Sequence, residues 1–249
     1  MKVIVAKDYD SVSETAAKII AKTIIEKPDA VLGLPTGTSP IGTYKKLIEY
    51  YKAGLLSFAK VNTVNLDEYV GLSHSHEQSY HYFMNDNLFS HIDIPKKNAR
   101  VPDGTGDNLD KNCKDYDAIL EKYPRDLQLL GIGGNGHIGF NEPNTPFDSK
   151  THIVTLTEKT KKDNSRLFKE GEKVPEKAIT MGISEICQAK KIVLVANGKN
   201  KADAVYDMIS GRVSENCPAS ILQLHPDVVI VLDKEAAAKL DASAIDEIL

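Results

Sequence analysis

The sequence contains little cysteine, and its three cysteines are far apart. Cys113, Cys187 and Cys217 form no CxxC pair, and their number is odd. A disulfide framework needs paired cysteines, and a zinc knuckle needs closely spaced ones. The sequence therefore supports neither of these, and a reducing cytoplasm is the compartment that we expect.

Long apolar runs, a strong charge of one sign and low-complexity tracts are also missing. No stretch approaches the roughly 20 apolar residues of a membrane span, and the apolar run after Met1 is too short for a secretory signal. A net charge of −4 and a pI near 6.0 give no electrostatic reason to bind nucleic acid or an anionic membrane. Without a linker or a repeat, a chain of 249 residues that is 41% hydrophobic predicts one α/β domain over residues 1–249.

Short apolar runs alternate with stretches of helical periodicity along the chain. Strands are expected at residues 2–6, 30–34, 61–66, 126–130, 152–156, 190–196 and 228–232. Helices are expected at residues 13–25, 41–51, 77–89, 107–122, 158–170, 202–209 and 218–224. This alternation predicts a mainly parallel, twisted sheet covered on both faces by helices.

A glycine-rich stretch at residues 131–143, GIGGNGHIGFNEP, follows the strand expected at 126–130. Its glycines let the backbone turn sharply and let a ligand approach closely. Asn135, His137 and Glu142 lie within this stretch. A histidine and a carboxylate on a loop at a strand's end are what acid–base chemistry on a small molecule needs. A tight turn with a hydrogen-bonded histidine is the simpler alternative, but the concentration of glycine and polar groups favours a site.

Three other expected strands end in polar loops. The loops 36–39 (TGTS) and 198–201 (GKNK) each lie between a strand and a helix, where backbone N–H groups converge on an anion. Asp67 and Glu68 follow the strand expected at 61–66. Because the carboxyl ends of parallel strands open at one edge of a sheet, these loops can form a single pocket. The residues predict an acid–base enzyme for a small phosphorylated metabolite, without a metal or a redox cofactor.

Nucleotide and metal sites are disfavoured by the motifs. There is no GxxxxGK[ST] sequence for a nucleoside triphosphate. The glycine-rich stretch matches the GxGxxG spacing, but Gly139 and Pro143 interrupt the helix that a dinucleotide site needs. The histidines between residues 74 and 91 lack the i, i+4 pair of a helical zinc site.

Four motifs together resemble the glucosamine-6-phosphate deaminases, in the glucosamine/galactosamine-6-phosphate isomerase family. They are LGLPTGTSP at 32–40, NLDEYVGL at 65–72, GIGGNGHIGFNEP at 131–143 and LQLHP at 222–226, and they span nearly the whole chain. The resemblance implies a hydrolase that converts glucosamine 6-phosphate and water to fructose 6-phosphate and ammonia in amino sugar catabolism. It also implies a Rossmann-like three-layer αβα fold, shared with 6-phosphogluconolactonase and ribose-5-phosphate isomerase.

The resemblance further implies a role for each matching residue. Asp67 matches the proton acceptor that moves a proton between carbon-2 and carbon-1 of the opened sugar. His137 matches the histidine that opens the sugar ring, and Glu142 matches the carboxylate that supports it. Asn135 stands where some members have aspartate, and because an amide does not titrate, it can act only through hydrogen bonds. The implied phosphate ligands are Thr36, Gly37, Thr38, Ser39, Arg166 and Lys201.

Two further expectations concern regulation. The charged stretch 158–170 is interpreted as part of a lid at about residues 152–181. Allosteric members of the family bind N-acetylglucosamine 6-phosphate between subunits with a serine, an arginine and a lysine, and Thr145, His152 and Val154 stand in those places here. Losing two cations removes most of the attraction for a phosphate. We therefore expect a non-allosteric enzyme that is a monomer or a small homo-oligomer.

Two alternatives stay open on the sequence alone. A 6-phosphogluconolactonase or another sugar-phosphate isomerase on the same fold would use a similar phosphate loop and histidine. A sugar-phosphate sensor domain is more remote, because such regulators need a DNA-binding helix-turn-helix and this sequence begins directly with its first expected strand. Release of ammonia from glucosamine 6-phosphate distinguishes the deaminase from both alternatives.

Overall fold

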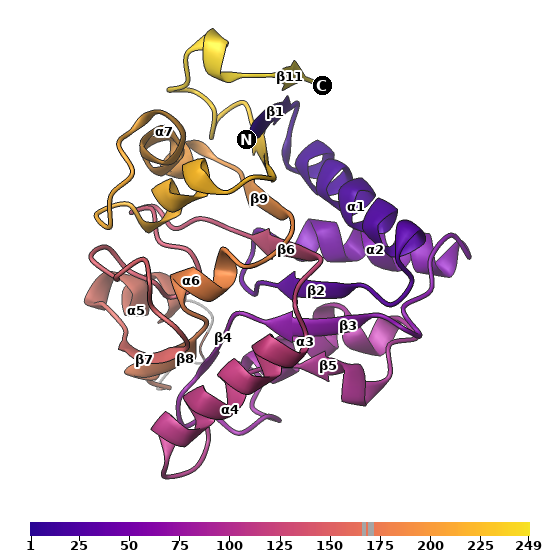
Figure 1. Cartoon of the computed structure of the whole chain (residues 1–249), viewed down its shortest axis with the longest axis vertical. Coiled ribbons are helices and arrows are strands. Elements are labelled where there is room, and N and C mark those ends of the chain that lie inside the picture. Colours follow the sequence, from indigo (N-terminus) through magenta and orange to yellow (C-terminus); the bar gives the residue numbers. More distant parts are fainter. Residues whose placement is uncertain (166–167, 169–171) are drawn as a thin grey trace.

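The structure is a computed structural model that describes residues 1–165, 168 and 172–249 (Figure 1). The strands of the main sheet are β1 (Lys2–Ala6), β2 (Val31–Leu34), β3 (Asn62–Asn65), β5 (Ala99–Arg100), β6 (Leu127–Leu130), β9 (Ile192–Ala196), β10 (Val228–Asp233) and β11 (Glu247–Ile248). Within the described residues these eight strands run parallel in the order β11-β1-β10-β9-β6-β2-β3-β5. The first and last strands pair, so the two ends of the chain lie at one edge of the sheet (Figure 1).

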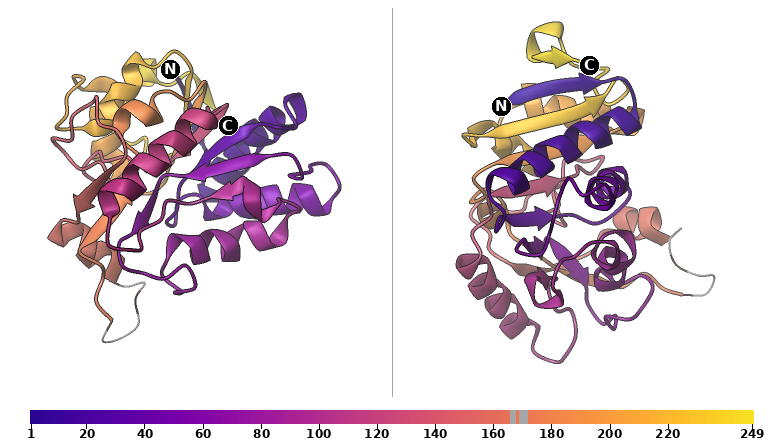
Figure 2. Two further views of the ribbon diagram at one scale, coloured as in Figure 1. Left: turned by 60° about the horizontal axis from the view of Figure 1, so that its bottom comes forward. Right: turned by 90° about the vertical axis from the view of Figure 1, so that its right-hand side faces the viewer.

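Helices cover both faces of this sheet, which confirms the expected three-layer αβα fold (Figure 2). On one face are α1 (Tyr9–Glu26), α2 (Ile41–Lys52) and α3 (Tyr80–Asn87), and on the other are α4 (Leu109–Lys122), α6 (Ile183–Ile186) and α7 (Ala202–Ser210). Alternate residues of a strand serve opposite layers: Val193 of β9 packs with the α1 layer, and Leu194 packs with the α7 layer. Strands buried on both faces explain the continuous apolar runs.

Polar residues set where several helices begin. Asp8 caps α1, where its Oδ1 accepts the Ser11 N–H at 2.9 Å, and Asn108 caps α4, where its Oδ1 accepts the Lys111 N–H at 3.0 Å. Such caps satisfy the free N–H groups of a first turn. The stretch 218–224, expected as a helix, is a 3₁₀-helix. No helix of the described residues is long and apolar enough to cross a membrane.

A second, antiparallel sheet lies beside the carboxyl edge of β3, and the sequence did not predict it. It contains β4 (Asp67–Tyr69), β7 (His152–Thr155) and β8 (Lys177–Thr180), in the order β4-β8-β7. The strand expected at 152–156 therefore pairs here instead of in the main sheet. The lid expected at 152–181 consists, in its described part, of β7, α5 (Glu158–Ser165) and β8. Arg166, expected to bind phosphate, lies outside the described residues.

Candidate active site

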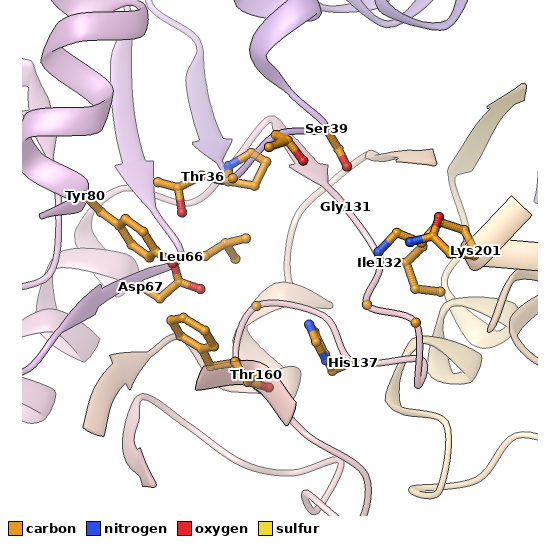
Figure 3. Close-up of a pocket in the computed structure, with 18 of the residues that line it drawn as sticks. Thr36, Ser39, Leu66, Asp67, Tyr80, Gly131, Ile132, His137, Thr160 and Lys201 are labelled. Atoms are coloured by element: carbon orange, nitrogen blue, oxygen red, sulfur yellow. The ribbon is translucent and has the colours of Figure 1, made fainter. Parts of the chain in front are cut away.

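A cavity of about 500 Å³ opens at the carboxyl ends of β3, β2, β6 and β9, four neighbouring strands of the main sheet (Figure 3). The loop after each of these strands contributes to its wall, as the sequence predicted from the parallel arrangement. Figure 3 shows Asp67 and His137 reaching into this cavity from different elements, with Ser39 and Lys201 at other parts of its rim. The structure thus brings the expected site residues that it describes to one place.

The loop 36–39 joins β2 to the amino end of α2. Gly37 has a φ of +87°, which favours glycine and turns the backbone toward the cavity. Pro40, at the N-cap of α2, makes no side-chain cap, and the loop that leads into this helix lines the cavity, where a helix amino terminus favours an anion. Tyr9, which the sequence did not predict here, holds this turn: its hydroxyl donates to the Ser39 carbonyl at 3.2 Å and accepts the Gly42 N–H at 2.8 Å.

His137 stands on the glycine-rich loop after β6, and its neighbours determine its tautomer. Its Nδ1 lies 2.7 Å from Oδ1 of Asn135, and because that oxygen can only accept, Nδ1 carries the proton. The Asn135 Nδ2 donates to Oε2 of Glu142 at 2.7 Å. The same Glu142 oxygen is 3.7 Å from Nδ1 of His137, so the carboxylate acts on the histidine mainly through Asn135. We call His137, Asn135 and Glu142 the histidine relay.

A glycine makes room for the relay. A Cβ at Gly133 would lie 2.2 Å from Cε1 of His137, so any larger residue would displace the imidazole. The Gly133 N–H also donates to the His137 carbonyl at 2.9 Å, which closes the loop. Glycine is required here by this close approach.

Glu142 is a buried carboxylate with several donors. Burial raises its pKa, but interactions with His137, Thr160 and Asn135 outweigh burial and lower the pKa of Glu142 to about 2. The hydroxyl of Thr160, on α5, donates to Oε1 of Glu142 at 2.6 Å. A carboxylate with this pKa is ionised at neutral pH, so a negative charge lies beside the pair of Asn135 and His137. The sequence did not predict Thr160, because a threonine in a charged helix carries no local signal.

Asp67 is the first residue of β4, where the chain leaves the main sheet. Its side chain is 5% exposed and lines the cavity. Burial and then the negative charge of Glu68 raise the pKa of Asp67 to about 8, against a lowering by a hydrogen bond from Thr36. A carboxyl group with a pKa near the working pH is suited to take up a proton and return it.

Glu68, the neighbouring carboxylate, stabilises the start of α3. It is fully buried and accepts the N–H groups of Tyr80 at 2.9 Å and His81 at 3.0 Å, and also His81 Nδ1 at 2.8 Å. These bonds hold the amino end of α3, from which Tyr80 lines the cavity. Within the described residues, no group of three or more histidine, cysteine, aspartate or glutamate side chains is placed so that it could hold a metal ion.

Two basic residues of the described part of the chain line the cavity. Lys201, at the turn before α7, lines the wall as the sequence predicted for a phosphate ligand. Lys162 of α5 also lines the cavity and was not predicted. The loop 36–39 and Lys201 thus share a cavity with the acid–base groups Asp67 and His137. That arrangement can hold a phosphorylated small molecule while protons are moved at its other end.

Comparisons with known proteins give a consistent result. A family model described as glucosamine-6-phosphate isomerases/6-phosphogluconolactonase matches residues 6–230. The glucosamine-6-phosphate deaminase of Thermoanaerobacter pseudethanolicus is 54% identical over 249 residues, covering 100% of this chain and 98% of its own. A solved structure of a monomeric glucosamine-6-phosphate deaminase is 49% identical, with a TM-score of 0.93 over 96% of this chain and 99% of its own. The 6-phosphogluconolactonase of Trypanosoma cruzi shares the fold, with a TM-score of 0.79 at 20% identity over 97% of each chain.

Proposed function

The chain belongs to the family of glucosamine-6-phosphate isomerases and 6-phosphogluconolactonases, and we propose that it converts glucosamine 6-phosphate and water to fructose 6-phosphate and ammonia. One observation carries this proposal: Asp67 and His137, whose Nδ1 is held by the rest of the histidine relay, line the same cavity as the phosphate loop. The close relatives that carry the deaminase name support it. We further propose that the protein is a cytoplasmic monomer in amino sugar catabolism, which its few cysteines and its monomeric structural relative support.

Ring opening is the first chemical step. The phosphate is held by the loop 36–39 and Lys201, which places the sugar ring against His137. The unprotonated Nε2 of His137 takes the proton from the anomeric hydroxyl, and the imidazolium gives a proton to the ring oxygen as the bond from carbon-1 to that oxygen breaks. The ionised Glu142 stabilises the imidazolium through Asn135.

Asp67 then moves a proton between two carbons. As a carboxylate it removes the proton from carbon-2 of the open aldehyde while the carbonyl oxygen takes a proton from the substrate's own ammonium group, which gives an enolamine, and it returns the carbon-2 proton to carbon-1. The product is an iminium ion at carbon-2. Water adds to this carbon, and the carbon–nitrogen bond breaks to release ammonia and leave the ketone of fructose 6-phosphate. One base serves both carbons because they are adjacent.

We propose the segment 152–181 as the lid of this site, since its α5 contributes Thr160 and Lys162 to the wall.

The proposal is tested by measuring ammonia release from glucosamine 6-phosphate in a coupled assay. 6-Phosphogluconolactone serves as the competing substrate, and its hydrolysis is followed by acid release. Ammonia formation with no lactone hydrolysis above background is the expected result. Lactone hydrolysis without ammonia formation would support the lactonase alternative and reject the deaminase.

The pH dependence of kcat/KM should reflect Asp67. The base must be ionised to accept a proton, so kcat/KM is expected to fall as the pH is lowered below about 8, the pKa of Asp67, approaching tenfold per pH unit. Glu68→Gln removes one of the causes of the raised pKa and should move this limb to lower pH. A limb that stays in place in the variant would belong to the substrate and would contradict the assignment to Asp67.

We propose that N-acetylglucosamine 6-phosphate does not activate the enzyme. His152 directs its Nδ1 to the Lys150 carbonyl at 2.8 Å, and Val154 packs against the cluster around Tyr69 and Phe140. Neither position supplies the cations that a second phosphate needs. The rate should depend hyperbolically on glucosamine 6-phosphate, and added N-acetylglucosamine 6-phosphate should not lower the half-saturating concentration. Sigmoidal kinetics that the ligand makes hyperbolic would contradict this prediction.

A further inference from the structure

Thr160 is buried, unlike the other side chains of α5 that the structure describes. The helix has the strongly charged sequence EKTKKDNS, yet Thr160 is only 8% exposed and lines the cavity. Its hydroxyl donates to Oε1 of Glu142 at 2.6 Å, a short bond to a charged acceptor. Its oxygen in turn accepts the hydroxyl of Thr157 at 2.9 Å. Because Thr157 supplies the proton of that bond, the proton of Thr160 is free to point at Glu142.

The hydrogen bonds around the histidine relay converge on the carboxylate of Glu142. Thr160 donates to Oε1 of Glu142, and the Asn135 amide donates to Oε2. With its NH₂ group on the carboxylate, Asn135 must turn its oxygen to His137, which fixes the proton on Nδ1. The Nε2 atom is then left as the proton acceptor. The orientation of the Glu142 carboxylate therefore sets the tautomer of His137 through two successive hydrogen bonds.

We propose that Thr160 is a positioning residue for ring opening, whose hydroxyl holds Glu142 in the orientation that fixes Asn135 and His137. This inference rests on the proposed function. Thr160 supplies the partner of one carboxylate oxygen, and the Asn135 amide supplies the partner of the other. Without that hydroxyl the carboxylate can rotate, and the Asn135 amide is no longer restricted to one orientation. Thr160 belongs to α5. The Nδ1-protonated tautomer of His137 therefore requires that α5 packs against the glycine-rich loop.

The test compares Thr160→Val, which has the shape of threonine without the hydroxyl, with Thr160→Ser, which keeps the hydroxyl. Thr155→Val is the matched control, because Thr155 is exposed on β7. For Thr160→Val we expect kcat with glucosamine 6-phosphate to fall about 10- to 100-fold, part of the effect of a general acid–base group, with KM changed less than about threefold. Thr160→Ser and Thr155→Val should stay within about threefold of wild type.

Two further measurements separate positioning from folding and from the proposed function. The 5-deoxy analogue of glucosamine 6-phosphate lacks the ring oxygen, so it cannot close a pyranose ring, and Thr160→Val should process it at nearly the wild-type rate. The imidazole ¹⁵N resonances of His137 should change in Thr160→Val and be restored in Thr160→Ser, whichever substrate the enzyme uses. Unchanged resonances, or equal losses in both Thr160 variants, would overturn the proposal for Thr160. A wild-type protein that releases no ammonia would overturn the proposed function instead.

Discussion

Asp67→Asn is expected to abolish ammonia release while making the folded protein more stable. An amide cannot accept a proton from carbon-2, so the rate should fall by at least the factor of about 10²–10⁴ that a positioned general base contributes. Asparagine has nearly the same shape, and the backbone pairing of residue 67 with Thr180 does not depend on the side chain. The loss of activity should therefore occur in a fully folded protein.

The stability effect follows from the raised pKa of Asp67. In the folded protein this pKa is about 8, against an ordinary value of 3.8, so folding favours the protonated form. Below about pH 4 the carboxyl group is neutral in both states and has no ionisation cost. As the pH rises from 4 to 8 the unfolded state loses its proton first, and the free energy of unfolding decreases. The neutral amide avoids this decrease, so the variant should be more stable at neutral and alkaline pH.

Thermal unfolding at two pH values measures this effect. At pH 8 we expect Asp67→Asn to gain about 1–2 kcal/mol, or a few degrees in the melting temperature. At pH 4.5 the difference should be much smaller. Circular dichroism on the same samples checks that the fold is unchanged. Activity close to wild type would reject Asp67 as the proton acceptor, and a melting temperature that falls equally at both pH values would reject the buried, protonated carboxyl group.

The main sheet could be predicted because its signal is local. Six of the seven expected strands lie in it, as β1, β2, β3, β6, β9 and β10, since buried parallel strands are short apolar runs between helices. The seventh, at 152–156, pairs in the second sheet, and the two-residue strands β5 and β11 were not predicted. The shared edge of the sheet then brought the loop 36–39, Asp67, His137 and Lys201 into one cavity without any knowledge of tertiary contacts. Topology and periodicity were sufficient for this part of the site.

The second sheet could not be predicted, because its pairing is not local. β4 has only three residues, Asp67, Glu68 and Tyr69, and two of them are charged residues that are depleted in strands. It becomes a strand because β8, more than 100 residues later, offers it a partner, in which Thr180 pairs with Asp67. Thr160 was missed for a related reason, because its partner Glu142 lies 18 residues earlier, on the glycine-rich loop and not on α5. When a side chain from a different segment completes a site, the sequence around that residue does not indicate its role.

His137→Gln is expected to affect ring opening much more than the later chemistry. Glutamine can take a hydrogen bond from its surroundings, but it cannot carry a proton from the anomeric hydroxyl to the ring oxygen. With glucosamine 6-phosphate the rate should fall by about 10²–10⁴, the contribution of a general acid–base group. The side chain is smaller than an imidazole, so the space that Gly133 leaves accommodates it and the fold should be kept.

Two features of the kinetics test the role of His137. The 5-deoxy analogue needs no ring opening, so the variant should process it with only a small loss, and equal losses with both substrates would reject the assigned role. Glucosamine 6-phosphate also opens slowly without a catalyst, and Asp67 in the variant can still act on the open form. At high concentrations of His137→Gln the rate should therefore stop rising with enzyme, because uncatalysed opening becomes limiting. Wild-type enzyme opens the ring itself, and its rate should stay proportional to its concentration over the same range.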